Sequence, residues 1–325
     1  MKAIEIERPG KDYRLAVGEQ SRPWPGPGAV LIRVAAAGLN NADLLQARGL
    51  YPVPPGAPSI LGMEVSGTIA ELGQGVTGWK VGDRVCALLA GGGYGEYAAA
   101  DAGSVLPVPE TIDLVEAAGL PEAAFTAWTN IMDTGRLAPG ESLLIHGGTS
   151  GIGSLAIQIF AARGHRVFTT AGNDAKCKAA ARFGASRAIN YRSEDFVPVV
   201  KAETGGAGVD VILDMVGGDY VQRNIDAAAT WGRIVNIAYQ SGFKAEVNFA
   251  PVLTKRLTLG ATTLRGRDPG QKRAIHDALL QEVWPLLGTG VRPVIDRVFP
   301  LEQAQKAHEY MAGTGHIGKI LLQMP

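Results

Sequence analysis

The feature that most constrains the fold of this chain is a glycine-rich segment, Gly147-Gly148-Thr149-Ser150-Gly151-Ile152-Gly153. It follows the apolar run Ser142–His146 and leads into a run of small and branched residues, Ile152–Arg163. An apolar run, a glycine turn and a helical pattern in this order predict one strand-turn-helix unit. Glycines at such a turn let the backbone approach a pyrophosphate, and the amides at the helix N-terminus point toward it. The segment therefore predicts a dinucleotide-binding turn.

The match to the G-x-G-x-x-G pattern is imperfect, because Gly148, Ser150 and Gly153 occupy its three positions. A serine can still offer its hydroxyl and its amide to a phosphate, and Gly151 relieves the crowding beside it. A plain glycine-rich connection between a strand and a helix is the alternative. The position of the turn at the head of a long alternation favours the cofactor site. The expected contacts at the turn are Gly148, Thr149, Ser150, Gly151 and Ile152.

Strand-like and helix-like runs alternate after the turn. The further expected strands are Arg166–Ala171, Arg187–Tyr191, Val209–Val216, Arg233–Ala238 and Leu257–Leu264, with helices over Asp174–Phe183 and Tyr220–Ala229. Strands that alternate with helices predict an α/β fold with a parallel, doubly wound (Rossmann) sheet.

The first part of the chain, to about residue 122, has a different texture. Its short β-like runs are broken by Pro and Gly and predict an irregular β-rich lobe: Lys2–Glu7, Ala29–Ala36, Glu64–Leu72, Arg84–Leu89, Tyr94–Ala100 and Ser104–Pro107. The tail continues with helices over Gly270–Leu287 and Leu301–Ala312 and strands over Val294–Phe299 and Lys319–Gln323. Because a six-stranded sheet is already complete, we assign the tail to the first lobe. The expected domains are 1–122 plus 266–325, and 123–265.

Length, charge and cysteine content narrow the class of protein. A chain of 325 residues suits two domains better than one core. Thirty-one basic and 31 acidic residues cancel, so no net charge attracts nucleic acid or an anionic membrane. The N-terminus lacks the apolar core of a signal peptide, and we expect a cytoplasmic protein with a small-molecule partner. Cys86 and Cys177 are too few for a cysteine-rich zinc site and are interpreted as structural thiols.

The choice of cofactor depends on the end of the second expected strand. NAD sites place an Asp or Glu there for the ribose 2′-hydroxyl. This chain has Thr169-Thr170-Ala171-Gly172, without an acid, and we expect the nearby Asp174 to cap the next helix. Lys176 and Tyr191-Arg192 could instead face a 2′-phosphate, although solvated charges are the alternative. The pattern favours NADPH, with Thr170, Gly172, Lys176 and Tyr191 as contacts.

Several sequence blocks in the same order carry a family resemblance over essentially the whole chain. They are Ala37-Gly38-Leu39-Asn40-Asn41-Ala42-Asp43, Ile60-Leu61-Gly62-Met63-Glu64-Val65-Ser66-Gly67, Val81-Gly82-Asp83-Arg84-Val85, Leu143-Leu144-Ile145-His146-Gly147-Gly148, Thr170-Ala171-Gly172 and Ile317-Gly318-Lys319-Ile320. The chain resembles the zinc-independent quinone oxidoreductases of the medium-chain dehydrogenase/reductase superfamily, most closely the p53-inducible type. The resemblance implies a Rossmann domain inserted into a β-rich, GroES-like catalytic domain.

The resemblance also bears on metal binding. Zinc-dependent members of the superfamily hold their catalytic zinc with a Cys before the first helix, a Gly-His-Glu segment and a further Cys or Asp. Asn40 stands at the first position here and Met63 at the histidine position. A thioether is a poor zinc ligand and an amide a poorer one. We therefore expect no metal, and we interpret Glu64 as structural.

The resemblance implies the residues of the acceptor and cofactor sites. Asn40 and Tyr51 would lie over the nicotinamide and form the catalytic site, where an amide and a phenol could hydrogen-bond a quinone oxygen. A packing role for Tyr51 and a turn or cap role for Asn40 are the alternatives. Further cofactor contacts carried over by position are Asn40, Thr126, Val216, Tyr239, Leu264, Arg265 and Lys319. For Arg265 a surface charge is the alternative.

The function that we expect is hydride transfer from NADPH to a quinone-type acceptor without a metal. Reduction of the double bond of an enone, 2-alkenal or enoyl thioester is the alternative within enzymes, with Tyr51 as the proton donor. A non-catalytic NADPH-binding protein is the alternative from another class. The family also implies a homodimer formed through the sheet edge near Leu257–Leu264.

Overall fold

The computed structural model describes all residues, 1–325, and they form two compact units. The first unit contains Met1–Phe125 and Leu264–Pro325, and the second contains Thr126–Thr263. The segment with the glycine turn is thus bracketed by two parts of the other unit. The division into a catalytic domain of residues 1–122 plus 266–325 and a dinucleotide-binding domain of residues 123–265 stays a prediction.

The second unit is built on one parallel sheet. Its strands are β8 (Ser142–His146), β9 (Arg166–Ala171), β10 (Arg187–Asn190), β11 (Val209–Asp214), β12 (Ala228–Asn236) and β13 (Thr258–Ala261). Their order is β10-β9-β8-β11-β12-β13, and every neighbouring pair is parallel. The helices are α3 (Gly151–Ala162), α4 (Asp174–Arg182), α5 (Phe196–Glu203), α6 (Tyr220–Ala227) and α7 (Ala250–Lys255). The strand order reverses at β8, as in a Rossmann sheet, so the predicted fold class is confirmed.

Helix α5, between the third and fourth strands, was not predicted from the sequence. Its segment, Phe196–Glu203, contains Pro198 and three valines, which weaken a helical pattern. Pro198 lies in the first turn, where its missing amide costs no hydrogen bond. Asp195 caps the helix, because its Oδ1 accepts a hydrogen bond from the amide of Val197 at 3.1 Å. The capping acid therefore outweighs the low helix propensity.

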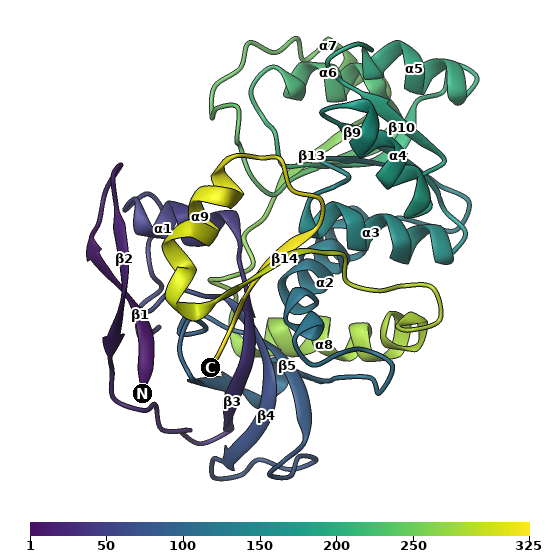
Figure 1. Ribbon diagram of the computed structural model, residues 1–325. Coiled ribbons are helices and arrows are strands. Elements are labelled where there is room, and N and C mark those ends of the chain that lie inside the picture. Colours follow the sequence, from purple (N-terminus) through teal and green to yellow (C-terminus); the bar gives the residue numbers. More distant parts are fainter. The chain divides into compact units, whose positions relative to one another are not determined.

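The first unit contains a mostly antiparallel sheet. Its strands are β3 (Ala29–Gly38), β4 (Glu64–Leu72), β5 (Arg84–Leu88), β6 (Tyr97–Asp101), β7 (Val105–Pro107), β14 (Ile295–Pro300) and β15 (Lys319–Gln323), and β1 (Lys2–Arg8) pairs separately with β2 (Arg14–Glu19). The sheet order is β14-β15-β3-β4-β5-β7, with β6 paired to β3. The chain end, yellow in Figure 1, thus lies beside the purple strand β3, with Leu321 opposite Gly38. The last strand of the tail therefore pairs with a strand from the first part of the chain.

Four α-helices accompany this sheet: α1 (Asn41–Ala47), α2 (Pro121–Trp128, which continues into the second unit), α8 (Pro269–Glu282) and α9 (Ala304–Ala312). The helix that we predicted over Gly270–Leu287 ends at Glu282, and a short 3₁₀ turn, Trp284–Leu286, follows. Pro285 is the reason, because it lacks an amide and disfavours the α conformation of the residue before it.

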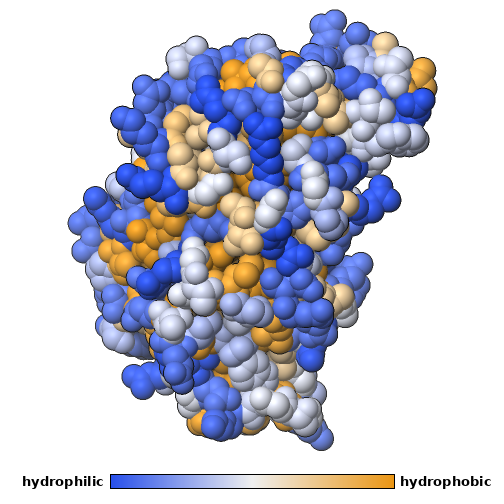
Figure 2. Space-filling view, turned by 90° about the vertical axis from the view of Figure 1, so that its right-hand side faces the viewer, coloured by the Kyte–Doolittle hydropathy of each residue, from blue (hydrophilic) through white to orange (hydrophobic).

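Each unit has its own apolar core. In the first unit the core lies between the sheet and helix α9, with Val65, Tyr94 and Leu322 among its members. In the second unit Phe168, Phe196 and Ile212 belong to a buried cluster that the strands share with α5 and α6. On the face drawn in Figure 2, hydrophobic residues reach the surface in groups between hydrophilic ones. None of the helices is long and apolar enough to cross a membrane.

Candidate functional site

The glycine turn of the second unit leaves no room for side chains at Gly148 and Gly153. A Cβ atom on Gly148 would lie 2.0 Å from Oγ1 of Thr169, and one on Gly153 would lie 2.3 Å from the carbonyl oxygen of Gly147. Gly147 has a φ of +74°, in the left-handed region that favours glycine. The amide of Gly148 donates to the carbonyl of Thr170 at 3.0 Å and holds the turn against β9. These clashes are with the protein's own atoms, so the two glycines allow the tight turn and the close helix packing of a dinucleotide-binding turn.

Ser150 is the N-cap of helix α3. Its Oγ accepts a hydrogen bond from the amide of Gly153 at 3.0 Å, and its own amide donates to the carbonyl of Gly147 at 2.9 Å. We expected the amide of Ser150 to face a phosphate, but the tight turn directs it inward. The hydroxyl proton remains a donor. The amides of Gly151 and Ile152, at the first two positions of the helix, have no acceptor within it.

The N-terminus of α4 differs from the prediction in its cap. Oδ1 of Asn173, and not a carboxylate of Asp174, accepts a hydrogen bond from the amide of Lys176 at 2.8 Å. Asp174 is already the first residue of the helix, so its side chain cannot reach back to cap it. It accepts a hydrogen bond from Nδ2 of Asn190 at 2.7 Å instead. The acid nearest to the end of β9 therefore has a partner within the protein.

The structure brings Gly172 and Tyr191 together at the carboxyl ends of β9 and β10. A Cβ atom on Gly172 would lie 2.8 Å from the hydroxyl oxygen of Tyr191. Tyr191 is 44% exposed, and Arg192 beside it is also exposed. Because α4 begins two residues after Gly172, Lys176 lies at the same edge of the sheet. The predicted 2′-phosphate residues thus share one sheet edge.

Sequence reasoning missed Asp214, a fully buried residue at the end of β11. Its carboxylate accepts hydrogen bonds from the amides of Val216, at 2.6 Å, and Gly217, at 3.2 Å. It also accepts from Nδ2 of Asn224, at 3.0 Å, and of Asn236, at 2.8 Å. These bonds fix the loop after the fourth strand, where Val216 was predicted to contact the cofactor. The available signal was an acid that ends an apolar strand.

Two cofactor contacts predicted separately, Val216 and Tyr239, are neighbours. The amide of Ser241 donates to the carbonyl of Val216 at 2.8 Å, so the loop after β12 bonds back to the loop after β11. A Cβ atom on Gly217 would lie 2.5 Å from the ring of Tyr239. The two loops therefore form one surface at the carboxyl edge, where ligands of such sheets bind.

The hydroxyl of Thr170 faces the interior of the second unit. Its Oγ1 lies 3.0 Å from Nδ1 of His146, and Nε2 of His146 lies 2.7 Å from Oδ1 of Asn224. Burial lowers the pKa of His146. His146 is thus a core residue, and a cofactor contact of Thr170 depends on its backbone.

Thr126 is 5% exposed and lies in helix α2. Its carbonyl accepts a hydrogen bond from Nδ2 of Asn130 at 2.8 Å, and Oδ1 of Asn130 accepts one from Oγ1 of Thr262 at 2.5 Å. The helix continues as a π-helical turn, Thr129–Thr134. Such turns are frequent at functional sites.

In the first unit, Asn40, Glu64 and Lys319 form a buried polar cluster. Nζ of Lys319 donates to Oδ1 of Asn40 at 2.8 Å and to Oε1 of Glu64. Nδ2 of Asn40 donates to the same Oε1 at 2.9 Å, and Oε2 of Glu64 accepts from the amide of Glu122 at 2.9 Å. All three clustered side chains are under a tenth exposed. The structure thus joins two predicted site residues, Asn40 and Lys319, both directly and through Glu64.

A second buried chain of polar groups, also missed from the sequence, starts beside Asn40. Oδ2 of Asp43 accepts from the amide of Asn40 at 2.8 Å and from the hydroxyl of Tyr94 at 3.2 Å. That hydroxyl lies 3.3 Å from Nε2 of His308, and Nδ1 of His308 lies 3.0 Å from the hydroxyl of Tyr13. Burial raises the pKa of Asp43 to about 6 and, with Arg48, lowers the pKa of His308 to about 3. The chain fixes the N-terminus of α1.

Tyr51 and Arg265 are also neighbours in the first unit. The guanidinium carbon of Arg265 lies 5.5 Å from the ring centroid of Tyr51. Burial, and the charge of Glu122, raise the pKa of Tyr51, so its hydroxyl stays protonated at neutral pH. Leu264 and Arg265 belong to this unit and not to the unit of the glycine turn. Arg265, a predicted cofactor contact, therefore lies beside Tyr51, a predicted catalytic residue.

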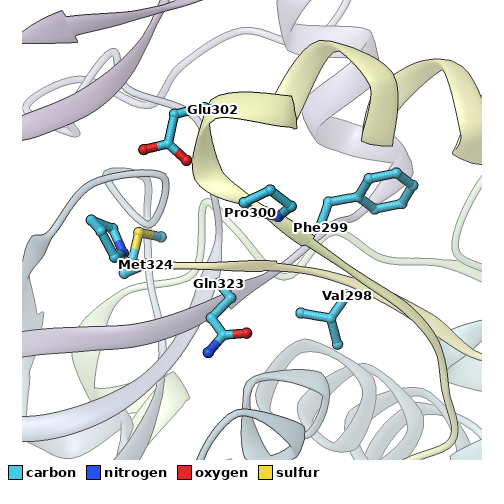
Figure 3. Close-up of a pocket in the computed structure, with 7 residues that line it drawn as sticks. Val298, Phe299, Pro300, Glu302, Gln323 and Met324 are labelled. Atoms are coloured by element: carbon cyan, nitrogen blue, oxygen red, sulfur yellow. The ribbon is translucent and has the colours of Figure 1, made fainter.

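Two surface hollows contain none of the predicted site residues. One, of about 210 Å³, lies in the first unit between strand residues 298–300 and the chain end 323–325, and Glu302 is its single charged side chain (Figure 3). The other, of about 450 Å³, lies in the second unit and is lined by Arg136, Glu141, Trp231, Arg233, Arg256 and Thr258.

Comparison with known proteins decides the family. Residues 183–322 match the family model described as zinc-binding dehydrogenase, and residues 26–110 match the alcohol dehydrogenase GroES-like domain. The chain is 31% identical to a quinone oxidoreductase of Rattus norvegicus, over 99% of this chain and 97% of that protein. The chain belongs to the medium-chain dehydrogenase/reductase superfamily. The family models and this relative therefore support the oxidoreductase class that the sequence predicts.

Other relatives in this superfamily are parts of larger proteins. The chain is 34% identical, over 99% of its length, to a segment of a phenolphthiocerol/phthiocerol polyketide synthase from Mycobacterium tuberculosis. It spans only 15% of the length of that synthase.

Solved structures of the superfamily agree with the fold. Escherichia coli quinone oxidoreductase in complex with NADPH matches with a TM-score of 0.88 at 31% identity, over 99% of this chain and 100% of that one. CurK enoyl reductase matches with a TM-score of 0.87 at 29% identity, over 100% and 99%.

The residues present do not fit the zinc that the first family model implies. No group of three or more His, Cys, Asp or Glu side chains is placed to hold a metal ion. Met63 and Asn40 are poor ligands, and Oε1 of Glu64 accepts hydrogen bonds from the Lys319 ammonium and from Asn40. A cation of the protein itself therefore neutralises the one carboxylate in this cluster.

Proposed function

We propose that this protein reduces a quinone-type acceptor with a hydride from NADPH and without a metal ion. Two relatives that it matches over nearly their full lengths are described as quinone oxidoreductases, and one of them was solved with NADPH. When bound, NADPH supplies the hydride, and an electron-poor acceptor takes it with only modest polarisation. The p53-inducible subtype and a cytoplasmic location stay predictions.

The observation that carries this proposal is the contact between Lys319 and Glu64. The ammonium group bonds to the carboxylate and to the amide oxygen of Asn40, so charge in this cluster is balanced without a metal. Alcohol oxidation through a metal alkoxide needs a Lewis acid that these residues do not hold. Reduction of an already polarised acceptor needs none.

We propose that the glycine turn and the sheet edge of the second unit hold NADPH. The tight turn that Gly148 and Gly153 allow brings the helix amides of Gly151 and Ile152 to its tip, and these amides suit a pyrophosphate. No acid is free at the end of β9 for a ribose hydroxyl, since Asp174 is bonded to Asn190. Lys176 and Tyr191 supply a cation and a hydroxyl for the 2′-phosphate, which supports NADPH over NADH. The other proposed contacts are Asn40, Thr126, Thr149, Ser150, Thr170, Gly172, Val216, Tyr239, Leu264 and Lys319.

We propose that Tyr51 donates a hydrogen bond to the acceptor oxygen on which negative charge develops. Its raised pKa keeps the donor protonated, and the nearby Arg265 charge favours an oxyanion. Asn40 has a positioning role in this proposal. Its side-chain amide is bonded to Lys319 and to Glu64, so the side chain is held in one orientation.

Reduction of a carbon-carbon double bond is the second candidate. It is favoured by the similarity to CurK enoyl reductase and to the segment of a polyketide synthase. The hydride would then reach carbon, and Tyr51 would be the proton donor. Oxidation of NADPH with 1,4-benzoquinone, compared with 1-octen-3-one and crotonyl-CoA, separates the two. Turnover confined to the enone or the thioester would favour double-bond reduction over quinone reduction.

A non-catalytic NADPH-binding protein is the third candidate, and the glycine turn alone does not distinguish it. Binding of NADPH without turnover of any acceptor would support it. Tyr51→Ala distinguishes the roles further, because the enzyme proposal requires this variant to lose activity while it still binds NADPH.

A further inference from the structure

Arg265 is a buried cation with unused hydrogen-bond donors. The residue is 6% exposed, and its Nε donates to the carbonyl of Ala90 at 2.7 Å. Nη1 and Nη2 are both buried and have no hydrogen-bond partner. A guanidinium carries five donors in a planar fork, and leaving them unpaired away from water is costly. The two terminal nitrogens therefore offer a site for an oxygen-bearing ligand.

The surroundings of Arg265 hold the fork in place beside Tyr51. The bond from Nε to Ala90 fixes one edge of the guanidinium, and the ring of Tyr51 lies 5.5 Å from its carbon. Gly91 follows Ala90 with a φ of +159°, and a Cβ atom there would lie 3.4 Å from Nη2 and 2.7 Å from the carbonyl oxygen of Pro58. Glycine thus keeps the backbone close to the fork without covering it.

No carboxylate forms a hydrogen bond with the guanidinium group of Arg265. The backbone carbonyl of Arg265 accepts a hydrogen bond from Nζ of Lys272 at 3.0 Å, so a second cation lies at the backbone of this residue. Asp43 and Glu122 act on Arg265 only through longer-range charge, and Asp43 is already bonded to Asn40, Gly62 and Tyr94. Two cations without a directly bonded carboxylate favour an anionic ligand.

We propose that Arg265, next to Tyr51, binds an oxyanion carried by the acceptor, a carboxylate or a phosphate, so that acidic acceptors bind more tightly than neutral ones of the same shape. This inference rests on the proposed function, because it names the substrate class of the same site. The phosphates of NADPH are the other source of an oxyanion. Arg265 belongs to the unit of Tyr51, which favours the acceptor.

Binding of stable hydroquinones tests the proposal apart from turnover. Gentisate (2,5-dihydroxybenzoate) and methyl gentisate differ by the negative charge, and calorimetry of the full chain with saturating NADP⁺ gives both Kd values. We expect gentisate to bind at least about tenfold more tightly. Arg265→Met should abolish this preference and Arg265→Lys should keep part of it. Arg273→Met, on the exposed face of α8, should keep all of it.

Three further outcomes are decisive. Equal binding of acid and ester, or no measurable binding of the acid, overturns the proposal. If Arg265→Met weakens NADPH binding about tenfold and leaves the gentisate preference intact, the oxyanion belongs to the cofactor and the proposal is wrong. Far-UV circular dichroism checks that each variant is folded. A preference for gentisate without NADPH oxidation by any acceptor would contradict the proposed function but would still support the assignment of Arg265.

Discussion

The ammonium of Lys319 and the carboxylate of Glu64 form an ion pair inside the first unit, with side chains 4% and 0% exposed. Lys319 begins β15 and Glu64 begins β4, so the pair joins the returning tail to the first part of the chain. Oδ1 of Asn40 accepts a further bond from the same ammonium. A lysine near the chain end thus determines how a predicted catalytic residue is oriented.

Removal of this cation should destabilise the protein strongly. Lys319→Met leaves the carboxylate of Glu64 buried without its counter-ion, which typically costs about 3–5 kcal/mol. Urea unfolding at pH 7 measures the change. The double variant Lys319→Met with Glu64→Gln should recover a large part of the loss, because no charge then remains buried. Lys306→Met, on an exposed face of α9, is the matched control and should change stability by less than about 0.5 kcal/mol. A loss of that small size for Lys319→Met would show that the pair is not formed.

His308 should make the protein less stable in mild acid. Its folded pKa of about 3 lies below the ordinary value of 6.5, so only the unfolded chain takes up a proton between these values. The contribution of His308 to the free energy of unfolding is fully present above pH 6.5 and declines as the pH falls toward 3. Between pH 7 and pH 5 the decline should be about 2 kcal/mol. His308→Gln, which keeps polar contacts to Tyr13 and Tyr94, should lose this part of the decline.

Asp43 changes the free energy of unfolding in the opposite direction as the pH falls. The comparison of wild type with His308→Gln must therefore include its contribution. Its folded pKa of about 6 lies above the ordinary value, so the folded chain binds the proton more tightly and gains stability as the pH falls through 6 toward 4. This contribution is common to wild type and His308→Gln and cancels in their difference. Urea unfolding at pH 7 and pH 5 gives that difference. Equal pH dependence of the two proteins would contradict the assignment to His308.

Lys176→Ala should weaken binding of NADPH and leave binding of NADH unchanged. A charge-assisted hydrogen bond to the 2′-phosphate is worth about 1.5–3 kcal/mol, which is a rise in Kd of about 10- to 100-fold. Fluorescence titration of both cofactors measures the ratio. Lys178→Ala, two residues further along α4 and exposed, serves as the control. Equal losses for the two cofactors would contradict the assignment of the phosphate.

A homodimer through strand β13 should dissociate when its exposed apolar side chain becomes charged. β13 is the last strand in the sheet order, and Leu259 on it is 41% exposed. Unpaired edge strands are templates for pairing with another chain. Native mass spectrometry should find a dimer for the wild type and a monomer for Leu259→Lys. Val298→Lys, equally exposed on the edge strand β14, should leave the mass unchanged, and a monomeric wild type would refute this interface.

Local pattern was enough to predict the nucleotide-binding unit. Each apolar run with its glycine turn or helix is a contiguous signal, and strands β8 and β9 begin and end at the predicted residues, as β4 does in the first unit. The parallel, doubly wound sheet follows from the alternation, whereas the GroES-like domain came from the family resemblance. Helix α5 was missed because its stability depends on the cap from Asp195 and on tertiary packing that outweigh Pro198 and the valines.

The polar clusters of the site were harder to foresee. Glu64 and Lys319 are 255 residues apart, and no local sequence pattern predicts the hydrogen bond between them. Asp43, Tyr94 and His308 each resemble ordinary core or surface residues in the sequence. The family resemblance identified Asn40 and Lys319 as site residues, but only the fold shows that they are bonded to each other.

The most direct test of the central claim is steady-state oxidation of NADPH by 1,4-benzoquinone after dialysis of the enzyme against EDTA, followed at 340 nm. We predict that the treated enzyme turns over the quinone with the kcat/KM of the untreated enzyme, and that Tyr51→Phe lowers it at least about tenfold. Loss of turnover with EDTA that returns with zinc, or turnover that occurs only with 1-octen-3-one, would contradict the account.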